Sequence, residues 1–131
     1  MKPFKSRSFK SSLAFYRTRH RTPGCKLTHM FGVPLLLAAP AVFLISRKAG
    51  FCVTFTGLAL QMIGHSVFEK NEPTVWETKD PMAVPAAAVF TAEEWLDVVT
   101  GQWIKKNGWN LWEKRPVSRG VLSESYLHPV R

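Results

Sequence analysis

The sequence predicts an all-α membrane protein, and three features of the charge distribution carry this prediction. Two uncharged, largely apolar runs of 20 residues each, residues 27–46 and 49–68, are separated only by a short basic turn. Residues 1–26 carry eight Lys or Arg and no acid, whereas residues 69–97 hold seven of the nine carboxylates. The chain has 131 residues, a length that suits one domain.

Each uncharged run is long enough to cross a bilayer as a helix. Twenty residues of α-helix span about 30 Å, the thickness of the hydrocarbon core. Because only Arg47 and Lys48 separate the runs, we expect a transmembrane helical hairpin. A buried hairpin in a soluble protein is the alternative, but a domain of this size rarely encloses two such helices on all sides.

The segment after the hairpin is predicted to form a shorter helix pair that is tilted or partly re-entrant. Its uncharged part, residues 81–92, has 12 residues, too few to span a bilayer. Glu93, Glu94 and Asp97 follow directly. Because carboxylates are costly in lipid, Glu93 and Asp97, four positions apart on one helix face, should point toward protein or headgroups.

Both ends of the chain are basic, and we expect both to be extended. Residues 1–12 read as a basic arm, and residues 104–131 as a Trp/Lys-rich tail that lies at the membrane interface or docks onto a partner. The excess of Lys and Arg places the N-terminus on the cytoplasmic side of a membrane, or on the matrix side of an organelle. The acid-free first 21 residues also suit mitochondrial targeting, so the endoplasmic reticulum and the mitochondrial inner membrane both stay open. Nucleic acid is disfavoured despite the net charge of +9, because the apolar hairpin requires a membrane.

Three histidines are predicted to meet at one end of the hairpin. His29 and His65 each lie about 18 residues from the turn, hence roughly 26–28 Å along their helices, at the same level. The Pro23-Gly24 pair breaks the helix between His20 and His29 and lets the chain bring His20 back toward the other two. Glu69 follows His65 by four positions, on the same face of an α-helix.

Three imidazoles with a carboxylate nearby suit a divalent transition metal. Neutral nitrogen ligands fit iron, zinc, copper or nickel, and an open coordination position accepts water, oxygen or substrate. The alternative is that these histidines are interfacial polar residues with satisfied hydrogen bonds. Cys25 and Cys52 lack the CxxC spacing of a zinc knuckle or a redox pair.

Two sequence motifs resemble those of a small membrane family that includes the fungal 2-hydroxy fatty acid dioxygenase of phytosphingosine α-oxidation. The first is Y-x-x-x-H-x-x-P-x-x-K-x-x-H-x-x-G-x-P, present as Tyr16, His20, Pro23, Lys26, His29, Gly32 and Pro34. The second is GHSVFEKNEP, residues 64–73, and the DVVTG of residues 97–101 resembles the ending of short members. The resemblance covers about residues 13–103.

The resemblance implies an iron(II)-dependent, membrane-embedded enzyme that uses oxygen to shorten a 2-hydroxy acyl chain by one carbon. Its metal ligands here would be His20, His29 and His65, with Fe²⁺ as the expected ion and Zn²⁺ as the other candidate. Glu69 would orient a ligand imidazole, complete the shell or act as a base. Lys26 would meet the substrate carboxylate.

The chain departs from that family at two positions in the first motif. The family usually has asparagine where this chain has Cys25, and often at Thr22, and those amides would support the ligand loop. A second hypothesis follows from this departure. The chain would then be a non-catalytic accessory subunit of a large membrane complex, such as a mitochondrial inner-membrane assembly, that contacts other subunits through its basic and Trp-rich tails.

Overall fold

The computed structural model describes residues 8–117, and the regular secondary structure of this part of the chain is all helical, without strands. The predicted all-α class is therefore confirmed for these residues. In chain order the helices are α1 (Phe9–Arg19), α2 (Pro23–Ile45), α3 (Arg47–Ile63), the π-helix η1 (Gly64–Glu69), α4 (Thr74–Thr78), α5 (Ala83–Val99) and α6 (Trp103–Asn107). Part of the expected N-terminal arm, from Phe9 onward, belongs to α1.

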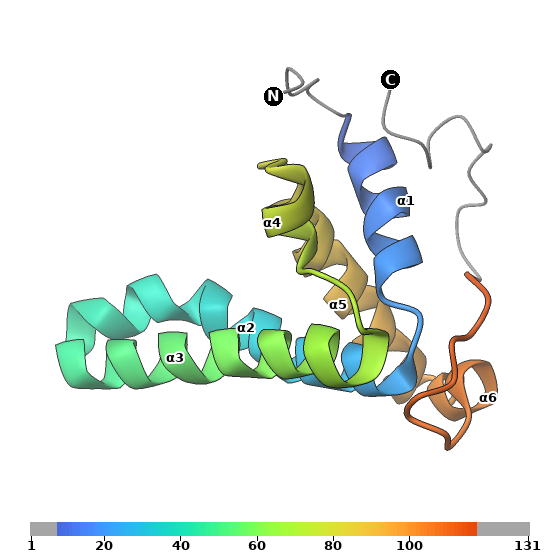
Figure 1. Cartoon of the computed structure of the whole chain (residues 1–131). Helices are drawn as coiled ribbons and strands as arrows, with labels where there is room; N and C mark the ends of the chain where they lie inside the picture. Colours follow the sequence, from blue (N-terminus) through green and yellow to red (C-terminus); the bar gives the residue numbers. More distant parts are fainter. Residues whose placement is uncertain (1–7, 118–131) are drawn as a thin grey trace.

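The two apolar runs form the long hairpin α2–α3 (Figure 1). The turn is a single residue, Ser46, whose extended backbone ends α2 and whose Oγ accepts the N–H of Ala49 to cap α3. The helices approach closely at Gly32 and Gly57, where a Cβ on Gly32 would lie 3.0 Å from the Gly57 carbonyl oxygen. Small residues at such a crossing are typical of helix pairs in membranes.

The surface of the hairpin favours lipid over a protein interior as its surroundings. The stretches Pro23–Ile45 and Arg47–Glu69 have mean hydropathies of 1.9 and 1.4 and are long enough to cross a membrane. Only 28% and 17% of their most apolar windows are buried within the fold. A core helix of a soluble protein would be mostly enclosed, so these are candidate membrane spans.

A second group of helices stands across one end of the hairpin (Figure 1). Here α1 packs along α5 through Leu13, Tyr16, Ala86 and Phe90, which form a small buried core. The outer face of α5 is apolar, whereas its acidic residues turn inward, as in the ion pair of Arg17 and Glu93 at 2.6 Å. Glu93 and Asp97 were expected to face protein or headgroups: Glu93 is paired with Arg17, and Asp97 is buried in protein, as is Glu94.

Helix α5 ends in a way that the resemblance in sequence had indicated. Its last residue is Val99, Thr100 is the C-cap, and Gly101 has φ +72°. A left-handed glycine is a common helix terminator because it has no Cβ to clash with the last carbonyl groups. The following residues turn back along the molecule, so the part of the Trp/Lys-rich tail up to residue 117 lies against the fold. Its remainder, residues 118–131, lies outside the described residues, as does the arm before Ser8.

Candidate metal centre

His20 is the residue that ends α1. Its backbone leaves the helix at φ −129° and ψ 68°, and its ring stacks on Tyr16 with centroids 3.9 Å apart. The Nδ1 atom lies 2.7 Å from the carbonyl oxygen of Tyr16. Because a carbonyl only accepts, Nδ1 carries the proton and Nε2 keeps a free lone pair.

His29 lies in the second turn of α2. That helix begins where the sequence analysis expected a chain reversal, with Thr22 as the N-cap and Pro23 in its first turn. The Nδ1 atom of His29 donates to the carbonyl oxygen of Cys25 at 2.8 Å. Its Nε2 atom is therefore the one available as a ligand.

His65 lies in the π-helix that continues α3. Its Nδ1 donates to the side-chain oxygen of Asn71 at 2.6 Å, and the Asn71 amide nitrogen in turn donates to the Arg19 carbonyl at 3.2 Å. The second bond sets the orientation of the amide and thereby the tautomer of the imidazole. Gly64, just before it, has no room for a Cβ, which would clash with the Thr28 hydroxyl group and lie 3.1 Å from the His29 ring.

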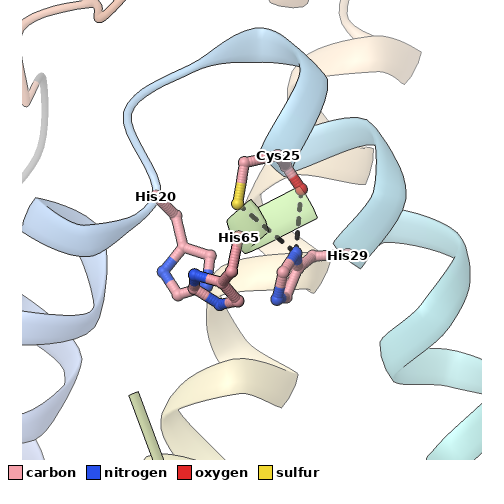
Figure 2. Close-up of side chains that lie close together, drawn as sticks. All are labelled: His20, Cys25, His29 and His65. Carbon is pink, nitrogen blue, oxygen red and sulfur yellow. Dashed lines mark hydrogen bonds between the residues drawn. The ribbon is translucent and has the colours of Figure 1, made fainter. Parts of the chain in front are cut away.

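The three imidazoles converge as the sequence predicted (Figure 2). The ring centroids of His20, His29 and His65 are 4.4, 4.7 and 4.9 Å apart, and all three residues are at most 1% exposed. The Nε2 atoms of His20 and His29 are buried without a hydrogen-bond partner within the described residues. An unpaired buried nitrogen is costly, and a metal ion would satisfy it.

Electrostatics favour the neutral, ligating form of this centre. Burial lowers the pKa of His20 well below its ordinary value of 6.5, and the neighbouring His29 and His65 lower it further. A cation is therefore disfavoured on this ring, whereas its neutral nitrogen can coordinate a metal.

Cys25 is a fourth member of the cluster that the sequence analysis did not propose. It is fully buried, and its Sγ lies 3.6 Å from Nδ1 of His29 (Figure 2). Its ligand atom and those of the three histidines lie within 4.8 Å of one another, so the four-residue group can hold a metal ion. The i, i+4 spacing of Cys25 and His29 on one helix was the signal available in the sequence.

Glu69 lies beside the cluster but is bound to backbone. One carboxylate oxygen accepts the N–H of Thr22 at 2.5 Å and also the N–H of Arg21, and the residue is 2% exposed. Residues 64–69 form a π-helix where an α-helical turn was expected, and His65 and Glu69 are both buried in it. The carboxylate thereby holds the loop between α1 and α2, directly after His20.

Lys26 lies on the other side of that loop, in an ion pair. Its Nζ is 3.3 Å from Glu94, whose second oxygen accepts the indole N–H of Trp103 at 2.9 Å. Lys26 lines a water-sized cavity of about 20 Å³ that also contacts His20. Its ammonium group is thus near the centre and already paired within the protein.

An apolar cavity of about 260 Å³ adjoins the histidines from the side of the hairpin. Tyr16, His29 and His65 contribute to its lining, together with Val33, Leu36 and Leu58 of the hairpin, Trp76 of α4 and Ala87 of α5. An apolar cavity of this kind, with a few polar groups at its wall, is typical of sites that bind small apolar molecules.

Comparison with known proteins identifies one family. No curated protein and no solved structure gives a significant match to the chain. Residues 6–100, which hold α1 to α5 and all three clustered histidines, match the description of one protein family. The chain belongs to that family, the 2-hydroxy-palmitic acid dioxygenase Mpo1-like proteins.

Proposed function

We propose that the protein is a metal-dependent membrane dioxygenase that shortens 2-hydroxy fatty acids by one carbon. The observation that carries the proposal is the set of three buried imidazoles, with Nδ1 of each hydrogen-bonded, at a cavity suited to an acyl chain. Family membership supports the reaction class. We propose Fe²⁺ as the ion, with Zn²⁺ as the alternative, because neutral nitrogen donors accept both.

The residues of this chain have separable roles in the proposal. His20, His29 and His65 would hold the ion, which when bound supplies Lewis-acid and redox chemistry to the 2-hydroxycarboxylate and oxygen. Glu69 holds the backbone of the loop that carries His20, so it orients a ligand rather than contacting substrate. Lys26, which is paired with Glu94 beside the small cavity at His20, would meet the substrate carboxylate there.

The apolar cavity gives the acyl chain a place that excludes water. Val33, Leu36 and Leu58 present aliphatic surface from the hairpin, and Ala87 closes the cavity from α5. With the hairpin in a bilayer, the fatty acid would enter this cavity from the lipid, with its carboxylate group first. The Lys/Arg excess before residue 27 would place this end at the cytoplasmic or matrix face of the endoplasmic reticulum or mitochondrial inner membrane.

Purified protein in detergent tests the proposal directly. We expect about one metal ion per chain by elemental analysis and a product one carbon shorter from 2-hydroxypalmitate with Fe²⁺ and oxygen. The matched control is palmitate, which lacks the 2-hydroxyl group that would complete bidentate binding. If the purified protein holds metal but leaves 2-hydroxypalmitate unchanged, the proposed activity is refuted and only the metal site is supported.

A second proposal is a non-catalytic subunit that keeps the family fold. The observation that favours it is the broad apolar face of α5, where Val84 is 52%, Leu96 57% and Val99 81% exposed, together with Trp109 at 82%. Such a face suits lipid or a partner chain. Absence of both metal and turnover, with co-purification of other membrane subunits, would favour this role.

A further inference from the structure

Residues 108–117, which follow α6, cross over the loop that carries His20. We call this segment the strap. The N–H of Gly24 donates to the Leu111 carbonyl at 3.0 Å, and the N–H of Arg115 donates to the Arg21 carbonyl at 3.0 Å. The Nε of Arg21 returns a bond to the Arg115 carbonyl at 2.9 Å. The loop is therefore tied to the strap on its outer side and to Glu69 on its inner side.

Two side chains of the strap hold it against the fold. The Trp112 ring packs on Phe68 at 5.1 Å between centroids, and the Arg115 guanidinium donates through Nε to the Lys106 carbonyl at 3.2 Å. A third contact joins the half-exposed ammonium group of Lys114 to the buried carboxylate of Glu69 at 3.9 Å. By contrast, Trp109 of the same strap is 82% exposed.

The strap also covers the small cavity beside His20. That cavity, of about 20 Å³, is large enough for one water molecule, and its lining includes His20 and Lys26 from the fold and Arg115, Pro116 and Val117 from the strap. Its walls carry charged groups of both signs, unlike the apolar cavity on the hairpin side. The histidine cluster thus adjoins two cavities: a polar one beside His20 and an apolar one beside His29 and His65.

We infer that the strap is the gate on the aqueous side of the histidine cluster, and that Trp112 and Arg115 are its positioning residues. The inference rests on the proposed metal site for its functional meaning. In the closed position the strap holds His20 in place and shields the cluster from water-borne solutes. Metal ions and small polar molecules reach the cluster when it lifts. The strap lies beyond residue 100, where the match to the family ends, so the gate is a feature of this chain beyond that match.

The strap is held by few contacts, so it can detach from the fold while the rest of the protein stays folded. It is joined to the fold by a few backbone hydrogen bonds, one tilted aromatic pair, two guanidinium hydrogen bonds and the contact of Lys114 with Glu69. Segments with few buried apolar contacts open locally at a small fraction of the global cost of unfolding. The buried core between α1 and α5 contains no residue of the strap.

Labelling of Cys25 tests the gate without any metal. Cys25 is fully buried and follows Gly24, which is bonded to the strap. In a Cys52→Ala background, a charged, water-soluble methanethiosulfonate reagent should react slowly with the metal-free protein. We expect Trp112→Ala and Arg115→Ala each to accelerate labelling by roughly tenfold, since each removes one of the few contacts that hold the strap closed. Trp109→Ala is the matched control and should label at the original rate.

Rescue and metal release complete the test. Trp112→Phe keeps an aromatic ring on Phe68 and should restore slow labelling, an effect that general destabilisation would not show. In iron-loaded protein, the two alanine variants should release Fe²⁺ to a chelator faster, in the same order as they label. Equal labelling in the Trp112, Arg115 and Trp109 variants would overturn the gate. If the original chain holds no iron, the proposed function fails while the labelling rates still decide the gate.

Discussion

The carboxylate of Glu69 accepts the backbone N–H of Thr22 at 2.5 Å, across 47 positions of sequence. This bond joins the end of the second hairpin helix to the loop between the first two clustered histidines. A buried carboxylate that accepts backbone N–H groups is strongly held, because charge assistance raises the strength of each bond. The relative placement of His20 and His29 therefore depends on a residue outside the motif that contains them.

Replacing Glu69 should weaken metal binding without removing a ligand. In Glu69→Ala the N–H groups of Arg21 and Thr22 lose their buried acceptor, so the loop relaxes. We expect the metal dissociation constant to rise by about 10–100-fold, the usual cost of losing outer support for a ligand. Competition with a chelator of known affinity measures it. Glu72→Gln, an exposed carboxylate nearby, is the control, and equal effects at both positions would contradict the role of Glu69.

Asn71 should control the orientation of the His65 ring. Asn71→Leu removes the acceptor of the Nδ1 proton, whereas Asn71→Asp keeps one. We expect metal affinity to fall by about 10–100-fold in the leucine variant and to be kept or raised in the aspartate variant. Titration of the two variants side by side distinguishes this order from a simple effect of volume. Equal losses in both would show that the hydrogen bond does not matter.

His65→Ala should abolish metal retention and leave membrane insertion intact. The substitution removes one imidazole from the cluster but leaves the apolar face of the hairpin unchanged. Elemental analysis reports the metal, and flotation with liposomes reports insertion. His128→Ala is the control of the same residue type, outside the described residues. Full metal content in the His65 variant would remove this residue from the site.

Gly64→Ala should destabilise the protein although alanine is the better helix former. The position has ordinary helical backbone angles, so alanine gains about 1 kcal/mol of intrinsic propensity. Its Cβ, however, would collide with the Thr28 hydroxyl group and press on the His29 ring. We expect a net loss of about 1–3 kcal/mol, as for other overpacked sites, seen as earlier thermal unfolding in detergent. Ser66→Ala, exposed on the same π-helix, should unfold as the unaltered chain does.

Filling the apolar cavity should impair fatty acid binding selectively. Ala87→Phe places a ring in a space of about 260 Å³, whereas Ala88→Phe changes a neighbouring residue outside the cavity lining. We expect the Ala87 variant to raise KM for 2-hydroxypalmitate by roughly tenfold or more, with unchanged metal content, because the acyl chain loses apolar surface to bury. The Ala88 variant should behave as the unaltered protein. A change of metal content in the Ala87 variant would show that the cluster itself was disturbed.

The sequence by itself determined those features that depend only on the regular geometry of a helix and on where a helix breaks. Each residue of a helix adds the same rise, so the equal spacing of His29 and His65 from the turn at Ser46 was enough to place both at one level. The Pro23-Gly24 pair marked the break that returns His20 to them. The hairpin, the all-α class and the convergence of three imidazoles are thus properties of local pattern and chain length.

Contacts between distant segments decided the rest. The bond from the backbone of Thr22 to Glu69 forms only because the π-helix η1, at the end of the hairpin, packs beside α2. The strap follows from hydrogen bonds between residues about 90 positions apart, such as Arg21 and Arg115. No local preference encodes such pairings, because they form only when packing brings unsatisfied backbone groups together and excludes the water that would otherwise bind them.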